Sequence, residues 1–257
     1  MTSPFNIVIP ARYQSTRLPG KPLIALLGKP MIQHVYEHAC DCGANEVVVA
    51  TDDERIADVA KAFGAEVCMT RGDHPSGTER IAEVANLKQW SDETMIVNVQ
   101  GDEPLLPERL VQQAAGQLND FPDAGMATVA TPLNDVAEVF DPNVVKVVLD
   151  HQGFAMMFSR AVLPWHRDHY AKAQVSLPAE VVYLRHIGLY GYRVSFLHQY
   201  VQWPASPIES IESLEQLRVL YYGGKIHVSV TAEPPGHGVD TADDILKVEA
   251  ALAALTR

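Results

Sequence analysis

The first half of the chain alternates between short apolar runs and stretches with apolar residues at helical spacing, and this alternation restricts the possible folds more than any other sequence feature. The apolar runs predict strands at Phe5 to Pro10, Glu46 to Ala50, Glu66 to Met69 and Met95 to Val99. Helices are predicted from Met31 to Gly43, from a cap at Asp52 or Asp53 to Gly64, from Thr78 to Gln89 and from Pro107 to Asn119. Strands separated by helices pair in parallel with right-handed crossovers, so we expect a doubly wound, nucleotide-type sheet.

The second half begins at about Gly125 with a different pattern. Strands are predicted at Met126 to Thr131, Val144 to Leu149 and Phe154 to Phe158, with a tight turn at His151 to Gly153 that favours antiparallel pairing. An excursion at Leu163 to Val182, a helix at Ile208 to Tyr222, a strand at Ile226 to Thr231 and a helix at Ala242 to Leu255 complete the prediction. The predicted fold class is α/β: a single doubly wound domain, residues 1–257, with a mainly parallel (mixed) sheet and a small antiparallel excursion.

A basic loop follows the first predicted strand. It carries Arg12, Arg17 and Lys21 among small and hydroxyl residues, and Pro19 and Pro22 stiffen it. Because ligands bind where parallel strands end, and a triphosphate needs donors already aimed at it, the loop predicts a triphosphate site. Neither standard phosphate-binding fingerprint is present, and a solvated basic turn explains the same residues equally well.

Composition narrows the classes of partner. The chain has 20 Lys and Arg against 32 Asp and Glu, a net charge of −12, which argues against nucleic acid or an anionic membrane as partner. No apolar run approaches the roughly 20 residues of a membrane span, and the first residues lack a signal-peptide pattern. The three cysteines are expected to be free thiols. We therefore expect a cytoplasmic protein.

Two carboxylates could hold a metal ion. Asp102 in VNVQGDEPL follows a predicted central strand, where a carboxylate can hold Mg²⁺ against phosphate oxygens, although Asp102 could instead cap its own turn. Asp240 in GVDTADD precedes the last predicted helix, and Asp240 or Thr241 could simply be that helix's N-cap. A third motif, DHPSGTER, could bind an anion or a base at a helix start, or could only cap the helix.

The sequences of these motifs resemble those of a known family. The first loop reads PARYQSTRLPGKP, and together with DHPSGTER, VNVQGDEPL and GVDTADD it is similar to the cytidylyltransferases that activate acidic sugars, in particular the 3-deoxy-manno-octulosonate cytidylyltransferase (CMP-Kdo synthetase) family. The resemblance implies the nucleotide-diphospho-sugar transferase type of fold. It also implies transfer of CMP from CTP to 3-deoxy-D-manno-octulosonate (Kdo) for lipopolysaccharide biosynthesis, with release of pyrophosphate, by a Mg²⁺-dependent homodimer.

The resemblance also assigns roles to individual residues. It places Arg12, Arg17 and Lys21 on the triphosphate, and Asp102 and Asp240 on the metal. Ser76, Gly77, Thr78 and Arg80 would contact cytosine and sugar, and Gln100 would face the sugar. The sugar-acid pocket would contain Arg160, Arg185, His186, Tyr190 and Glu215, within a sugar-binding and dimerisation subregion at about 155–205. Tyr183 to Trp203 could supply an apolar patch for the dimer, whereas Tyr190 and Tyr192 could also be core residues.

Other functions fit parts of the sequence. A cytidylyltransferase for amino-substituted Kdo or for sialic acid would use similar motifs, although the sialic acid enzymes typically have Lys-Asn where this chain has Lys21-Pro22. His34, Glu37 and His38 match the H-x-x-E-H pattern of some metallopeptidases. We interpret them instead as the surface of the helix that starts at Met31, because Val35 and Tyr36 form its buried stripe. A noncatalytic nucleotide-binding module is the third alternative.

Overall fold

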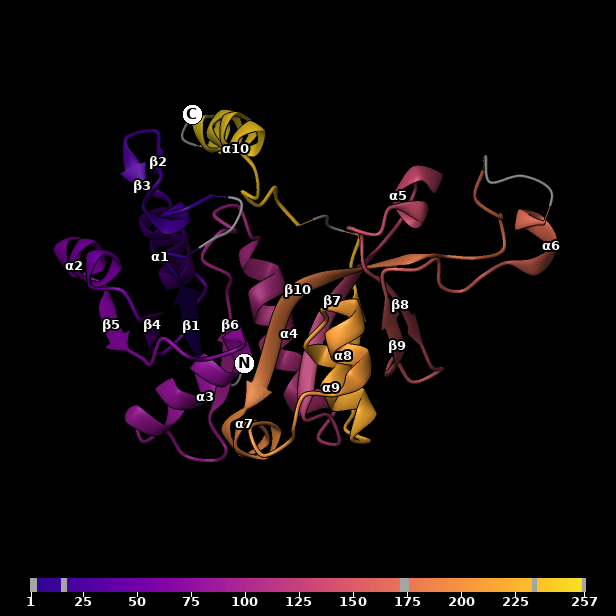
Figure 1. The fold of residues 1–257 in the computed structure, drawn as a ribbon, viewed down its shortest axis with the longest axis horizontal. Coiled ribbons are helices and arrows are strands. Elements are labelled where there is room, and N and C mark those ends of the chain that lie inside the picture. Colours follow the sequence, from indigo (N-terminus) through magenta and orange to yellow (C-terminus); the bar gives the residue numbers. More distant parts are fainter. Residues whose placement is uncertain (1–3, 15–17, 172–175, 233–234, 256–257) are drawn as a thin grey trace.

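The computed structural model of the chain describes residues 4–14, 18–171, 176–232 and 235–255. These residues form a nine-stranded mixed sheet whose main path runs β11-β7-β10-β6-β1-β4-β5, with β8 and β9 attached at β10 (Figure 1). The main-path strands are β1 (Phe5–Ala11), β4 (Val47–Thr51), β5 (Glu66–Met69), β6 (Met95–Asn98), β7 (Met126–Pro132), β10 (Leu184–Arg193) and β11 (Ile226–Val230). In this path β10 is antiparallel to both its neighbours, and the other paired strands are parallel.

Helices cover both faces of the sheet, which confirms the predicted doubly wound fold. One core lies under α1 (Met31–Asp41), α2 (Glu54–Ala62) and α4 (Glu108–Asp120). The opposite core lies under α3 (Gly77–Leu87), α7 (Val194–Tyr200) and α9 (Gln216–Tyr221). Because side chains of a strand alternate between faces, Ile7 and Ile9 of β1 enter the first core and Val8 enters the second. Such a strand is buried on both sides, which explains its uninterrupted apolar sequence.

Strand β10 has no counterpart among the predicted strands. Arg185, His186 and Arg193 interrupt its apolar pattern, yet it lies between β6 and β7 in the middle of the sheet. The aromatic segment that starts just before it was expected to supply an exposed patch. That expectation is wrong for Tyr200, and for Tyr192 the alternative of a core residue is confirmed, because both side chains are buried in the second core.

The predicted helix at Ile208 to Tyr222 is also wrong, because the structure has two short helices there. They are α8 (Pro207–Glu212) and α9, and Ser213 separates them with a left-handed φ of 52°. A buried ion pair holds them together, since Arg218 Nη2 lies 2.7 Å from Glu209 Oε1. The break places Glu215 at the N-cap of α9, where its side chain turns toward α3.

Two smaller parts project from the sheet (Figure 1). The first comprises α5 (Val136–Phe140), the hairpin of β8 (Lys146–Leu149) and β9 (Ala155–Ser159), and α6 (Arg167–Tyr170) within the predicted excursion. The second places α10 (Ala242–Leu255) against the hairpin of β2 (Ala25–Leu26) and β3 (Lys29–Pro30), where Val248 packs with Leu26, Met31 and Val239. The C-terminal helix therefore lies beside elements from the start of the chain.

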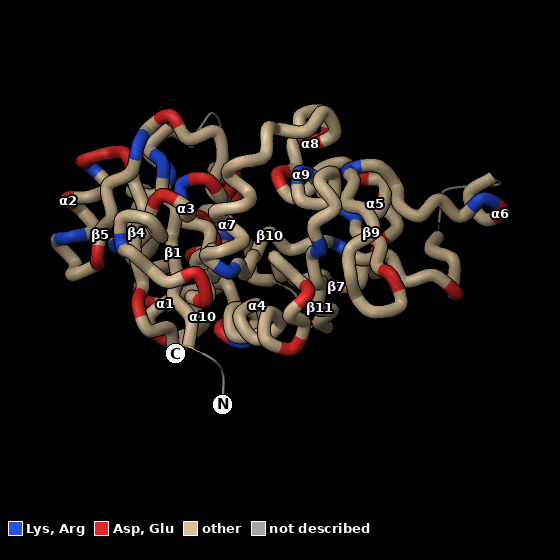
Figure 2. Tube along the Cα trace, turned by 90° about the horizontal axis from the view of Figure 1, so that it is seen from below, with Lys and Arg blue, Asp and Glu red and all other residues tan. Residues whose placement is uncertain are grey.

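The surface carries acidic and basic residues side by side along most elements (Figure 2). None of the helices in the described ranges combines the length and apolarity needed to cross a membrane. Cys40, Cys42 and Cys68 are free thiols, as expected.

Candidate functional site

The predicted charged residues meet at one edge of the sheet. Strands β1 and β6 are adjacent and parallel, so the loops that follow them emerge at the same edge. Lys21 begins the 3₁₀ turn η1 (Lys21–Leu23) after the β1 loop, and Asp102 lies in the loop after β6. The loop before α10 joins them, because Val239 N donates a 2.9 Å hydrogen bond to the carbonyl oxygen of Asp102.

Lys21 bridges the two predicted metal ligands. Its ammonium nitrogen lies 2.5 Å from Asp102 Oδ2 and 3.0 Å from Asp240 Oδ1. The Lys21 side chain is only 10% exposed, whereas those of Asp102 and Asp240 are 35% and 54% exposed. Gly20 precedes the lysine with a φ of 70°, and a side chain at Gly20 would press on the Tyr13 ring. The loop is therefore built to direct one buried cation at two carboxylates.

Asp244 holds the backbone at the start of α10. Asp244 accepts hydrogen bonds from the Thr241 backbone N–H at 2.9 Å and from the Thr241 hydroxyl at 2.8 Å. These bonds lower the pKa of Asp244. Asp244 thus accepts the hydrogen bonds of the residues just before α10. The Asp240 carboxylate contacts Lys21.

Glu103 is a member of this acidic group that sequence reasoning missed. Its carboxylate lies so close to Gly238 that a side chain there would be 2.7 Å from Glu103 Oε1. Burial, and then the charges of Asp102 and Asp240, raise the pKa of Glu103 to about 7. Oε2 of Glu103 is buried without a hydrogen-bond partner among the described residues. Its neighbour Asp102 in the QGDEP motif was the only available signal.

This group of carboxylates suits a divalent cation. Carboxylate oxygens are hard ligands that Mg²⁺ prefers, and Mg²⁺ commonly uses one or two carboxylates together with phosphate oxygens and water. Asp102 and Asp240 share the single ammonium of Lys21, and Glu103 lies beside them with burial as the main cause of its raised pKa. Within the described ranges, no three His, Cys, Asp or Glu side chains are arranged to hold a metal by themselves. The residues thus fit an ion that shares its ligands with a bound phosphate.

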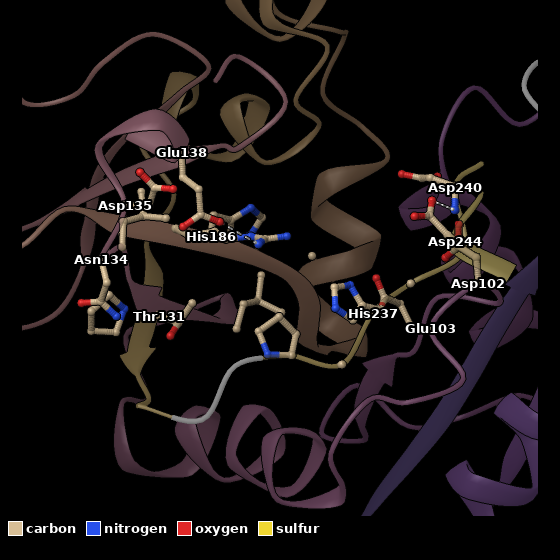
Figure 3. Close-up of a pocket in the computed structure, with 18 of the residues that line it drawn as sticks. Asp102, Glu103, Thr131, Asn134, Asp135, Glu138, His186, His237, Asp240 and Asp244 are labelled. Carbon is tan, nitrogen blue, oxygen red and sulfur yellow. Dashed lines mark hydrogen bonds and ion pairs between the residues drawn. The ribbon is translucent and has the colours of Figure 1, made fainter. Parts of the chain in front are cut away.

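Two cavities meet at the pair Asp102 and Asp240. The smaller, of about 400 Å³, is lined by Pro10, Ala11, Arg12, Gln14, Lys21, Pro22, Gly77, Gln100, Gly101, Asp102 and Asp240. The larger, of about 820 Å³, extends from the same two aspartates to His186, Arg185 and the start of α5. Figure 3 shows it with Asp102, Glu103 and Asp240 at one end and Asp135 and Glu138 at the other. The two aspartates therefore form a wall that both cavities share.

Arg12 connects the first loop to the DHPSGTER segment. Its Nη2 atom donates hydrogen bonds to the carbonyl oxygens of His74, at 2.8 Å, and Ser76, at 3.1 Å. Ser76 is the N-cap of α3, because its hydroxyl accepts a hydrogen bond from Glu79 N at 3.2 Å. Gly77 follows at the start of α3 and lines the smaller cavity. Arg17 lies outside the described residues.

A second polar cluster contains several residues of the predicted sugar pocket. The Thr78 hydroxyl donates to Glu215 Oε2 at 3.1 Å and lies 3.3 Å from the Tyr192 hydroxyl. The Tyr190 ring lies 5.3 Å from the His186 ring, and His186 Nε2 is 3.1 Å from the Thr128 hydroxyl. The cluster brings together α3, α9, β7 and β10, which are distant in sequence.

Burial determines the protonation of this cluster. It lowers the pKa of His186 to about 3, so that the imidazole is neutral near pH 7. Burial also raises the pKa of Glu215, which hydrogen bonds from Thr78 and the Gly77 backbone partly offset. It raises the pKa of Tyr190 well above its ordinary value. His186 and Tyr190 therefore offer neutral hydrogen-bonding groups near pH 7.

The predicted arginines lie in different surroundings. Arg80 is fully buried and contacts Asp52, at 3.0 Å, and the Thr70 hydroxyl. Arg160 Nε donates to the Glu212 carbonyl oxygen at 2.7 Å, away from the residues that line the two cavities. Arg185 lines the larger cavity and lies 3.7 Å from Glu138. In the structure, both Arg80 and Arg160 form polar contacts with other parts of the chain. Direct contacts of these two arginines with a ligand stay predictions.

The H-x-x-E-H pattern on α1 has a structural explanation. His34 Nε2 lies 2.8 Å from the Leu26 carbonyl oxygen, and His38 Nε2 contacts that of Leu106. Glu37 pairs with Lys29 at 2.8 Å. Both histidines are half-buried rather than exposed surface residues, so that part of our interpretation is wrong. His34 therefore connects α1 to strand β2, and His38 connects it to the loop before α4.

A doubly wound sheet with a basic first loop and paired carboxylates at its edge is the arrangement expected of a nucleotidyltransferase, and comparison with known proteins agrees. The chain belongs to the cytidylyltransferase family, whose sequence profile matches residues 6–226. This finding confirms the predicted enzyme class and overturns the metallopeptidase and noncatalytic-module alternatives.

Two individual proteins are similar to nearly the whole chain. A 3-deoxy-manno-octulosonate cytidylyltransferase of Photobacterium profundum is 56% identical over 248 residues, which cover 96% of this chain and 98% of the relative. A solved structure of CMP:2-keto-3-deoxy-manno-octonic acid synthetase in complex with CTP superposes with a TM-score of 0.88 at 43% identity, and covers 98% of this chain and 100% of the other. The predicted family resemblance and fold class are thereby confirmed.

Proposed function

We propose that this cytidylyltransferase transfers CMP from CTP to Kdo and releases pyrophosphate. The observation that carries the proposal is the wall of Asp102 and Asp240 between the two cavities. A nucleotide in the smaller cavity and a sugar acid in the larger would meet at this wall, where Lys21 supplies positive charge. The full-length similarity to the Photobacterium relative supports Kdo as the acceptor.

The chemistry needs positioning and charge stabilisation, and no covalent enzyme intermediate. The anomeric hydroxyl of the sugar attacks the α-phosphorus, and a new P–O bond forms. The bond from the α-phosphorus to the oxygen that it shares with the β-phosphate breaks, pyrophosphate leaves with that oxygen, and the hydroxyl proton passes to water. Arg12, Arg17 and Lys21 would bind the triphosphate. Gln100, which the family resemblance directs toward the sugar, lines the smaller cavity together with Gly77, so we propose that it contacts the nucleotide instead. Lys21 would also neutralise charge that develops at the reacting phosphate.

The acceptor side would combine one cation with neutral donors and acceptors. Arg185 lines the larger cavity and suits the carboxylate of a sugar acid. His186, kept neutral by burial, can donate or accept one hydrogen bond with a sugar hydroxyl. Tyr190 and Glu215 would orient the sugar from the adjoining cluster. Of these residues, Arg185 and His186 line the larger cavity.

Mg²⁺ is part of the proposal. Asp102 and Asp240 would hold it, and the ion would withdraw charge from the phosphate oxygens during the transfer. We further propose that the enzyme works in the cytoplasm as a homodimer in lipopolysaccharide biosynthesis, in line with the family resemblance.

Pyrophosphate release tests the proposed function. The purified chain would be incubated with CTP and Mg²⁺ together with Kdo, amino-substituted Kdo or sialic acid, and with ATP or UTP in place of CTP. We expect release only with CTP, and fastest with Kdo. Faster release with another sugar acid would replace Kdo as acceptor, and release without any sugar would contradict the transfer reaction.

A further inference from the structure

The contact of Lys21 with both carboxylates bears on how the metal enters the site. The Lys21 ammonium donates to one oxygen of Asp102 and to one oxygen of Asp240. The Lys21 side chain is more buried than either carboxylate, so its ammonium lies inside the site and not at the solvent-exposed surface. The same residue is the one that the sequence assigns to the triphosphate.

A lysine ammonium and a divalent cation compete for these oxygens. Both are attracted by the negative charge of Asp102 and Asp240, which Lys21 contacts at 2.5 Å and 3.0 Å. A dication that approached the two aspartates with Lys21 in place would meet a positive charge in direct contact with both of them. Oxygen atoms that already accept hydrogen bonds from an ammonium are also poorer metal ligands, because their lone pairs are engaged.

Lys21 also keeps the two aspartates together. Asp102 and Asp240 lie on separate loops, and like charges repel unless a cation is placed between them. The ammonium provides that cation, and the Val239 N–H bond to the Asp102 carbonyl oxygen fixes the backbones of the same two loops. A triphosphate carries more negative charge than the carboxylate pair and would compete for the flexible lysine side chain.

We propose that Lys21 excludes free divalent cations from Asp102 and Asp240 until a bound triphosphate draws its ammonium away, so that metal and nucleotide enter together. This inference rests on the proposed function. It gives Lys21 two successive partners: the aspartates in the free enzyme, and the triphosphate in the loaded enzyme. The loop is then ready for catalysis only when both the ion and the nucleotide are present.

The test measures metal binding by the nucleotide-free enzyme, with Mn²⁺ as a spectroscopic probe followed by electron paramagnetic resonance. The variants are Lys21→Met, which removes the charge at similar length, and Lys21→Arg, which keeps it. We expect Lys21→Met to bind Mn²⁺ at least about tenfold more tightly than the unaltered chain, in the usual range of coupling between two linked sites. Lys21→Arg should bind Mn²⁺ weakly, as the unaltered chain does.

Thermal unfolding supplies a second readout. Mn²⁺ alone should raise the Tm of Lys21→Met and leave that of the unaltered chain nearly unchanged, because only the variant has carboxylates open to the ion. Adding Asp102→Asn to Lys21→Met should abolish both the tight binding and the rise in Tm. This double variant ties the signal to the proposed ligands.

Two outcomes would overturn the inference in different ways. Equal, tight Mn²⁺ binding by the unaltered chain and Lys21→Met would show that the lysine excludes nothing, while the proposed transfer reaction would stand. Absence of Mn²⁺ binding by a folded Lys21→Met would remove the metal from this pair of aspartates. Pyrophosphate release by the unaltered chain is measured separately, and it decides whether the proposed function fails together with the inference on Lys21.

Discussion

Asp102 and Asp240 lie far apart in the sequence, and each has a simple local explanation as a capping residue. The structure gives them a common partner instead, because Lys21 contacts both within 3.0 Å. Asp244 accepts the hydrogen bonds of Thr241 at the start of α10. Side chains with a shared partner are expected to act as a unit, and their individual effects on turnover should not add.

A double-mutant cycle tests this unit. We expect Asp102→Asn and Asp240→Asn each to reduce turnover on the order of a hundredfold or more, as when a preorganised charge at a reacting phosphate is lost. The double variant should be little worse than the worse single variant, and each single variant should need more Mg²⁺ for half its maximal rate. The measurement is pyrophosphate release at saturating CTP across a Mg²⁺ titration.

Asp243→Asn is the matched control, because Asp243 lies in the first turn of α10 and lines neither cavity. Its turnover and Mg²⁺ requirement should stay close to those of the unaltered chain. Additive losses for Asp102→Asn and Asp240→Asn, with an unshifted Mg²⁺ requirement, would contradict the shared site.

His186 predicts a pH dependence of stability. Burial lowers its pKa from 6.5 to about 3, so protonation favours the unfolded chain, and this contribution to stability is complete above pH 6.5 and declines as the pH falls toward 3. The His186→Gln variant lacks this pH-dependent contribution, because glutamine does not titrate. The difference in free energy of unfolding between the unaltered chain and His186→Gln should therefore narrow below pH 6.5, by less than about 1.4 kcal/mol per pH unit because His186 is half-buried.

The measurement is denaturant unfolding of both proteins between pH 4.5 and 7.5. His151→Gln replaces an exposed histidine and controls for the substitution itself. A difference that stays constant over this range would show that His186 accepts a proton as readily in the folded chain as in the unfolded one.

At the scale of elements, β10 is the strand on which the site depends and the one that sequence patterns conceal. It separates β6 from β7 and carries Arg185 and His186 to the larger cavity, with Tyr190 beside the His186 ring. Its close approach to α4 requires a residue without a side chain, since a Cβ atom at Gly191 would lie 2.7 Å from the Ala114 carbonyl oxygen. The strand is therefore positioned by backbone contact as much as by its side chains.

Gly191→Ala should destabilise the fold by about 1–3 kcal/mol, because the added methyl group meets rigid helix backbone. Gly188→Ala is the matched control on the same strand, since a Cβ atom there has no neighbour within 4 Å. Urea unfolding of both variants provides the comparison. Equal stability of the two variants would show that α4 and β10 can separate at little cost.

At the scale of the whole molecule, the chain closes its site by bringing its last helix back to its first loop. Val248 of α10 is fully buried against Leu26 and Met31, and Val239 beside Asp240 belongs to the same apolar cluster. A hydrogen bond from Leu27 N to Glu249 Oε1, 2.9 Å long, fastens the helix further. Packing at the C-terminus therefore sets the position of one predicted metal ligand.

Val248→Ala should loosen this closure. We expect a loss of about 1–3 kcal/mol in stability from the cavity it creates, together with a higher Mg²⁺ concentration for half-maximal turnover. Leu246→Ala, at a position 71% exposed on the same helix, should change neither quantity appreciably. Thermal unfolding and a Mg²⁺ titration check both expectations. If Val248→Ala were destabilised but its Mg²⁺ requirement unchanged, the packing of α10 would not control the position of Asp240.

The class of fold, and the first strand, loop and helix of the site, follow from the sequence alone. Buried parallel strands such as β1 need uninterrupted apolar sequence, and helices such as α2 and α3 need a capping side chain, which Asp53 and Ser76 provide. These requirements are local, so they can be read along the chain. The same local reasoning placed Lys21 and Asp102 at strand ends.

Contacts between distant segments became visible only in the tertiary structure. The break at Ser213 depends on the ion pair of Arg218 with Glu209 and on the contact of Glu215 with Thr78, none of which leaves a periodic pattern. The central place of β10 depends on pairing with two strands at once. The meeting of Lys21 with Asp102 and Asp240 depends on α10 docking near the first loop, because electrostatic contacts act across space and not along the sequence.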